Sequence, residues 1–264
     1  TSQIRLETIM KDTLYTIPLT DAFNAEDECP FCFIHRRLEQ DAISFTLGAS
    51  YMEDDIRAQT DRLGFCKDHY KKLYDYGNRL GLAFILHTHY QKLEKDLDKM
   101  FGNLDTSSPS LFKRLKHATQ TNTSESSLAT SPLHEQLDSC YICERIERNF
   151  TRYMETFFYL LESNEEFKTL FLNSKGMCLE HFTALLELAP YRLKGETKTF
   201  FMNTSKQMLK ENLKRLEEDL SWFIDKNDYR NNAAPWKTSQ DAIPRGIQKL
   251  TGIYVQDEPF KKAH

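Results

Sequence analysis

The chain has 264 residues, of which 40% are hydrophobic and 28% are charged, and its net charge at pH 7 is −4. A chain of this length can bury a sizeable core, as one large domain or as two smaller ones. Because Lys and Arg are mixed among the acidic residues, the charge balance argues against nucleic acid or an anionic membrane as the main partner.

The composition and residue pattern of the sequence predict an all-α protein. Only nine Gly and eight Pro interrupt it, and Leu, Lys and Glu recur in long runs. No apolar run reaches the roughly 18 residues of a membrane span, and no signal-peptide pattern opens the chain. We therefore expect a cytoplasmic protein without membrane contact. Its six cysteines would then be reduced, which favours metal binding or redox chemistry over disulfides.

A CxxC pair and a CxxH pair stand in the first part of the chain: Cys29, Cys32, Cys66 and His69. An amphipathic run leads from Cys32 to about Leu47, and a second run, 51–63, leads back to Gly64. Helices of about 15 and about 13 residues travel similar distances at 1.5 Å per residue. We therefore expect Cys66 to return beside Cys32, so that these four residues form one site.

The stretch after Cys66 predicts one long helix. Its apolar positions step by three or four: Leu73, Tyr76, Leu80, Phe84, Tyr90, Leu93, Leu97 and Met100. His87 falls on this stripe and is expected to be a core histidine, with a contact to a small apolar ligand as the alternative. His89 is expected to be exposed, and Gly77 and Gly81 to allow close helix packing.

A segment rich in Ser and Thr, 105–138, predicts a flexible linker that follows a first half, 1–104. The second half, 139–230, repeats the pattern of the first with Cys140, Cys143, Cys178 and His181. The two CxxC pairs are offset by 111 positions and the two CxxH pairs by 112. We interpret this repetition as an internal duplication. In the second half, too, a helical hairpin is expected to bring the four ligands together.

The alignment of the two halves also assigns counterparts to His35 and His87. His35 would extend the first CxxC pair to CxxCxxH, but Ile146 occupies the matching place, so His35 is expected to be a surface residue. Asn203 is the counterpart of His87, and an aromatic cleft between the halves could bind a ligand around these two residues.

The C-terminal tail, 231–264, predicts a short helix that packs back on the core. Ile243, Ile247 and Leu250 have helical spacing, and the helix is expected to start after Pro244. Trp236 is a candidate anchor for the tail.

Three thiolates and one imidazole form a common closed shell for structural zinc. Each pair has i, i+3 spacing at an expected helix start, where free amides and the helix dipole favour the thiolate. We therefore expect two zinc ions per chain. An iron–sulfur cluster is an alternative, although such clusters usually have four cysteine ligands. The motif CPFC also looks like the CPxC of thioredoxin-like proteins, but no strand-like alternation surrounds it.

Five segments together resemble an uncharacterised bacterial family, found mostly in anaerobes, with paired CPxC and CxxH elements: "TIPLTDAFNAEDECPFC", "GFCKDHY", "CYIC", "GMCLEHF" and "IQKLTG". The resemblance covers nearly the whole chain and implies the architecture without an activity. Pro244 departs from the family's pattern. The hypothesis that follows is a non-catalytic binding or adaptor protein, with an unknown protein partner or a small apolar ligand. The alternative is a thiol-based redox enzyme or a metal or redox sensor that uses Cys29 and Cys32.

Overall fold

The computed structural model describes residues 14–102, 133–134 and 136–256. Every regular element in these residues is helical, which confirms the predicted all-α class. After a helical stretch at 14–24, the elements in chain order are α2 (Pro30–Thr46), η1 (Ala49–Met52), α3 (Asp54–Leu63), α4 (Lys67–Tyr76), α5 (Arg79–Gly102), α8 (Tyr141–Ser163), α9 (Glu165–Asn173), α10 (Leu179–Arg192), α11 (Gly195–Lys226), η2 (Tyr229–Asn231) and α12 (Ala242–Thr251). Most of the predicted linker 105–138 lies outside the described residues.

The described chain forms two compact units. The large unit contains 14–38 and 148–256, and the small unit contains the described part of 39–147. The division falls inside α2 and inside α8, so each of these helices begins in one unit and ends in the other. No helix among the described residues has both the length and the apolar character to cross a membrane.

Phenylalanine side chains fill the core of the large unit. The Phe157 ring is fully buried and lies 5.5 Å from the ring of Phe31 and 5.8 Å from that of Phe23. It also contacts Phe171 and Phe201 at 5.5 and 6.0 Å between ring centroids. The pair with Phe23 is stacked and the other three are edge-to-face, and both arrangements add to the free energy of burial. Core filling therefore accounts for much of the aromatic content.

The small unit corrects the predicted long helix after Cys66. The α4 helix ends at Tyr76 because Gly77 adopts the left-handed conformation, with φ of +97°. Asn78 then opens the next helix by accepting a hydrogen bond from the amide of Gly81. This break changes the direction in which the later side chains point.

The break makes the predicted apolar stripe of this region wrong. Leu80, Phe84 and Tyr90 are exposed. The prediction for the two histidines is reversed as well, since His87 is exposed and His89 is buried. The Nδ1 atom of His89 lies 2.9 Å from the backbone oxygen of Asp61 in α3. His89 is therefore the histidine of the α3–α5 interface.

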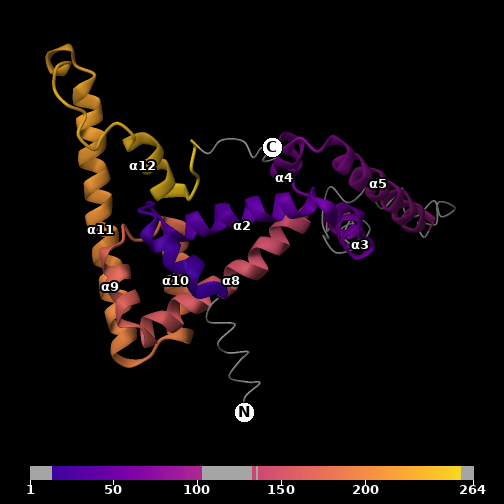
Figure 1. The fold of residues 1–264 in the computed structure, drawn as a ribbon, viewed down its shortest axis with the longest axis horizontal. Coiled ribbons are helices and arrows are strands. Elements are labelled where there is room, and N and C mark those ends of the chain that lie inside the picture. The colour runs from indigo at the N-terminus through magenta and orange to yellow at the C-terminus, as the bar shows by residue number, and fades with distance from the viewer. Residues whose placement is uncertain (1–13, 103–132, 135, 257–264) are drawn as a thin grey trace, which may run out of the picture. The chain divides into compact units, whose positions relative to one another are not determined.

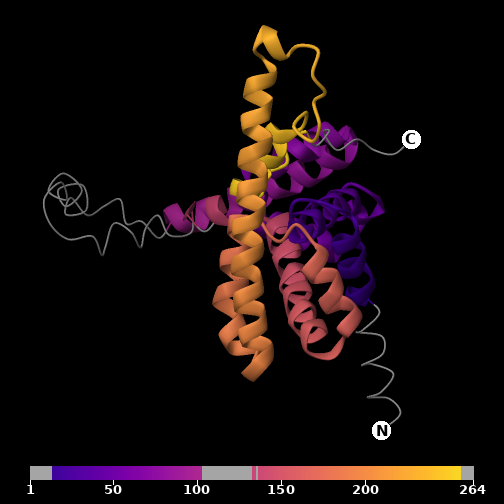
Figure 2. The same ribbon diagram turned by 90° about the vertical axis from the view of Figure 1, so that its left-hand side faces the viewer.

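The tail forms the predicted short helix, α12, but with a different buried face. The helix begins at Ala242, two residues before Pro244, because proline is tolerated in a first turn that needs no amide donor. Ile243 and Leu250 are exposed, whereas Lys249 is buried. In Figures 1 and 2, α12 lies beside α11. The buried residues of α12 are Ala242, Pro244, Gln248 and Lys249, and the polar ones contact acidic residues of the large unit, Gln248 at Asp27 and Lys249 at Glu28.

Candidate metal centres

The eight predicted ligands gather in two clusters. The first cluster lies in the large unit and contains Cys29, Cys32, Cys178 and His181. The second cluster lies in the small unit and contains Cys66, His69, Cys140 and Cys143. Within each cluster, the four ligand atoms all lie within 4.8 Å of one another. The eight predicted residues therefore form two clusters of three cysteines and one histidine that could each hold a metal ion, but their predicted grouping by sequence order was wrong. Each CxxC pair meets the CxxH pair of the other half.

Helix lengths explain this exchange. The α2 helix has 17 residues and the returning helix α3 only 10. At 1.5 Å per residue, α2 is about 25 Å long and α3 about 15 Å, so the chain returns only part of the way to the start of α2. His69 therefore returns to the level of Glu39, in the middle of α2, with Nε2 3.1 Å from Oε1 of that carboxylate. In the second half, α8 has 23 residues and α9 has 9. There the His181 ring returns to Phe150, in the middle of α8, at 5.1 Å between ring centroids.

All four ligand pairs stand at helix starts, as the spacing predicts. Cys66 and Cys178 are the N-caps of α4 and α10, and their backbone angles nearly coincide, with φ/ψ of −70°/168° and −68°/167°. Gly64 and Gly176 precede them by two residues and both have positive φ, which lets the chain turn sharply into each site.

The two CxxC pairs begin their helices in the same manner. The backbone oxygen of Cys29 accepts a hydrogen bond from the amide of Phe33, and that of Cys140 accepts one from the amide of Glu144. First-turn amides and the helix dipole thus favour the thiolate form at both pairs. Each cluster is built where two helix N-termini converge.

The donor atoms lie slightly closer together than they would in a tetrahedral metal shell. In the first cluster, Nδ1 of His181 lies 3.1–3.5 Å from the three sulfur atoms, and two of the sulfurs, those of Cys32 and Cys178, are 3.5 Å apart. In the second cluster, Nδ1 of His69 lies 3.2–3.3 Å from the sulfurs. Zinc bond lengths of about 2.3 Å to sulfur and about 2.0 Å to nitrogen imply edges of about 3.5 Å between nitrogen and sulfur and about 3.8 Å between two sulfurs, and the separations in both clusters lie within about 0.4 Å of these values. The residues of both clusters therefore fit a zinc ion.

The second cluster has a charged outer layer. Glu39 is buried, and besides its contact with His69 it accepts hydrogen bonds of 2.6 Å from Lys72 at both carboxylate oxygens. Burial alone would raise the pKa of the Glu39 carboxyl, but the bonds from His69 and Lys72 outweigh it and lower that pKa. The carboxylate fixes the imidazole so that Nδ1 faces the thiolates, which is the usual arrangement behind a metal-bound histidine.

The first cluster has an aromatic outer layer instead. The His181 ring lies between Phe31 and Phe150, at 5.8 and 5.1 Å between ring centroids. On another side the backbone of Gly252 covers the sulfurs, since a Cβ atom there would lie 3.5 Å from Sγ of Cys32 and 3.6 Å from Sγ of Cys178. The side chains of all four ligands are buried.

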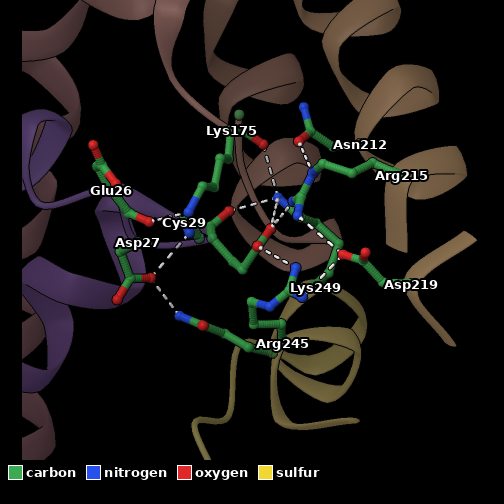
Figure 3. Close-up of polar contacts among 12 residues, drawn as sticks. Glu26, Asp27, Cys29, Lys175, Asn212, Arg215, Asp219, Arg245 and Lys249 are labelled. Atoms are coloured by element: carbon green, nitrogen blue, oxygen red, sulfur yellow. Dashed lines mark hydrogen bonds and ion pairs between the residues drawn. The ribbon is translucent and has the colours of Figure 1, made fainter. Parts of the chain in front are cut away.

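A buried charge network fastens α12 to this first cluster (Figure 3). The ammonium of Lys249, on a side chain only 1% exposed, donates to the backbone oxygens of Glu28 at 2.5 Å and Lys175 at 2.8 Å. Glu28 directly precedes Cys29, and Lys175 lies three residues before Cys178. One side chain therefore ties together the two loops that carry the ligands. The same ammonium lies 3.4 Å from the Glu28 carboxylate.

Arginines complete this network. The Glu28 carboxylate, which is buried, also accepts from Arg215 of α11 at 2.5 Å and lies 3.5 Å from Arg245 of α12. Arg245 donates in turn to Asp219 at 2.9 Å. Buried carboxylates and cations are thereby paired with one another, as burial requires.

In both clusters the histidine is held in its protonated form by neighbouring thiolates. Burial lowers the pKa of His69, but its contacts with Cys140 and Glu39 outweigh burial and raise the pKa to about 10. The pKa of His181 is likewise raised to about 10 by Cys178 and Cys29 against the effect of burial. Although burial raises the pKa of Cys140, the contact with His69 lowers it to about 6. Thiolates that stabilise a protonated imidazole can equally stabilise a divalent cation, which then displaces the proton from the imidazole.

Other residues singled out in the sequence lie elsewhere. His35 is exposed on α2, as predicted, and it is not among the ligands of either cluster. His87 and Asn203 are both exposed. Sequence reasoning missed Glu39 because it stands in a charged run, 36–41, that is typical of a solvated helix face. It missed Lys249 because an isolated lysine on a short helix is usually exposed. A signal for Glu39 would have been its place about two turns after a CxxC pair.

The family model for a family of unknown function, DUF6062, matches residues 10–257, so the chain belongs to that family. This match confirms the resemblance to an uncharacterised family over nearly the whole chain. No curated protein and no solved structure matches the chain.

Proposed function

We propose that this member of the DUF6062 family is a zinc-binding helical protein with two structural Cys3His sites and a non-catalytic role as a binding or adaptor protein. One observation carries the proposal: four protein donors converge in each cluster at close to the separations of a tetrahedral shell. Such a shell leaves no position for water or substrate. A histidine in each cluster supports zinc over an iron–sulfur cluster, which prefers four thiolates.

Duplication with exchanged ligands is the second part of the proposal. The halves 1–104 and 139–230 would descend from one helical unit whose CxxC pair binds metal together with the CxxH pair of another copy. The nearly identical backbone at Cys66 and Cys178 supports it. A second support is that Glu39 and Phe150 occupy matching positions at the offset of 111. Glu39 of α2 contacts His69, and Phe150 of α8 contacts His181.

The proposal also covers the binding partner and the cellular compartment. We propose a cytoplasmic protein whose partner is another protein or a small apolar ligand, in a bacterium of the anaerobic kind that the resemblance implies. The redox alternative on Cys29 and Cys32 has less support, because their side chains are 0% and 3% exposed and a reactive thiol must be accessible.

Elemental analysis of protein purified without oxygen or chelator tests the metal assignment. We expect about two zinc ions per chain, no visible absorption band and first-cluster thiols, those of Cys29, Cys32 and Cys178, that become reactive only after the metal is removed. Iron with a charge-transfer band would replace zinc in the proposal. A metal-free chain that keeps its fold would contradict the structural role.

A further inference from the structure

We propose that the second cluster is also a modification site, at which the thiolate of Cys143 reacts with hydroperoxides and the cluster releases its metal. This inference rests on the metal binding proposed above and gives the two clusters different roles. The first cluster would be a permanent structural site, and the second a site that responds to an oxidant.

Accessibility is the first argument. Cys143 is exposed and Cys66 is partly exposed, whereas Cys29, Cys32 and Cys178 are buried. Gly252 also covers two of the sulfurs in the first cluster. A hydroperoxide must approach a sulfur atom in line with its O–O bond, and only the second cluster offers such an approach among the described cysteines.

The outer layers supply an independent second argument. Through its hydrogen bond to Glu39, His69 becomes a stronger donor and leaves more electron density on the thiolates of its cluster. In the first cluster the histidine lies against Phe31 and Phe150 instead. There the buried ammonium of Lys249 donates to the carbonyl of Glu28, next to Cys29, and its positive charge lowers the nucleophilicity of the nearby thiolate.

The chemistry balances with two thiolates and one hydroperoxide. The Cys143 thiolate attacks the terminal oxygen, an S–O bond forms, the O–O bond breaks, and the alkoxide leaves and takes a proton from water. The Cys66 thiolate, whose sulfur lies 3.9 Å from that of Cys143, then attacks the sulfenic sulfur. An S–S bond forms, and hydroxide leaves and is protonated to water. The two thiolates supply the two electrons that reduce the hydroperoxide to alcohol and water.

Loss of two donors opens the second cluster. His69 and Cys140 alone do not form a closed shell, so the metal is released. The reaction needs no cysteine from the first cluster. Reduction of the disulfide by a thiol would regenerate all four donors.

The test treats the full chain, purified with its metal, with one equivalent of hydrogen peroxide per chain. A chromogenic chelator follows metal release, and differential alkylation with peptide mass spectrometry identifies the oxidised cysteines. We expect one metal equivalent to leave at least about tenfold faster than the other, with Cys66 and Cys143 as the first disulfide. Release of both equivalents at one rate, or first oxidation at Cys29 or Cys32, would overturn the proposal.

The mapping also separates this inference from the metal assignment. If the purified chain holds no metal, the proposed function fails, and the same mapping after loading with two equivalents of Zn²⁺ decides whether Cys143 is the reactive thiol. Cys143→Ser should abolish the fast oxidation of Cys66. The matched control is Glu144→Gln, an exposed neighbour in the same turn, which should leave the rates of both phases unchanged.

Discussion

The Sγ atoms of Cys32 and Cys178 lie 3.5 Å apart, although 146 positions separate the two residues in the sequence. Their contact joins the first turn of α2 to the N-cap of α10. In the second cluster, Cys66 and Cys143 make the corresponding contact over 77 positions. A metal that bridges such distant positions closes a long loop, which is the arrangement in which a cross-link removes most chain entropy.

Replacement of Cys178 by Ser tests the exchanged grouping directly. Because the first cluster loses one donor, we expect loss of about one metal per chain and faster alkylation of Cys29 and Cys32. Cys140 should keep the reactivity that it has in the unmodified chain. Alkylation followed by peptide mass spectrometry measures each cysteine separately.

The matched variant is Cys66→Ser, in the second cluster. It should expose Cys140 and Cys143 and leave Cys29 and Cys32 protected. Ligand sets that follow sequence order would give the opposite pattern in both variants, so a single labelling experiment decides between the two groupings.

The members of the two clusters could be predicted from sequence because the pairing of neighbouring donors is local. A CxxC or CxxH pair at a helix start places both side chains on one face, whatever surrounds it. The grouping could not be predicted, because it depends on where α3 and α9 end. A return helix of 10 residues instead of about 13 moves Cys66 by about 4–5 Å, which brings His69 beside Glu39.

The same dependence explains the errors along α4 and α5. Periodicity continues across Gly77, since a single left-handed residue leaves the spacing of apolar residues almost unchanged while it redirects the chain. His87 and His89 consequently exchanged their predicted environments. The buried face of α12 was missed because Lys249 is paired with Glu28, a residue more than 200 positions away.

Glu39→Gln should weaken the second metal site alone. The amide cannot accept as strong a hydrogen bond from His69, and Lys72 loses its charged partner. Removal of such an outer-layer carboxylate typically lowers metal affinity by about 10–100-fold. Chelator competition on the purified chain should show one weakened and one unchanged site.

A contrasting variant is Phe150→Leu, at the corresponding place of the first cluster. It removes an aromatic contact with His181 and leaves the second site unaltered. Equal weakening of both sites by Glu39→Gln would contradict an outer-layer role for this residue.

Lys249→Met should destabilise the large unit. The substitution leaves the carbonyls of Glu28 and Lys175 without their donor and removes a cation from the buried Glu28 carboxylate. Breaking a buried ion pair from one side costs about 3 kcal/mol or more. Urea unfolding at constant metal content measures this loss.

Arg230→Met supplies the control for Lys249→Met. Arg230 pairs with Asp228, but its side chain is 73% exposed, and exposed ion pairs contribute little to stability. This variant should unfold at the same urea concentration as the parent chain. Similar midpoints for both variants would show that the Lys249 contacts do not stabilise the fold.

Gly252→Ala separates backbone strain from contact with the first cluster. Gly252 has φ of +76° and Gly195 has φ of +51°, so alanine is strained at either position, at a cost of about 1–2 kcal/mol. Only at Gly252 would the new Cβ lie within 4 Å of neighbouring atoms, including Oε2 of Glu180 at 3.2 Å and two ligand sulfurs. We therefore expect both variants to lose a similar amount of stability, while only Gly252→Ala releases metal from the first cluster faster to a chelator. If Gly195→Ala accelerates metal release equally, strain rather than the cover over the sulfurs controls that site.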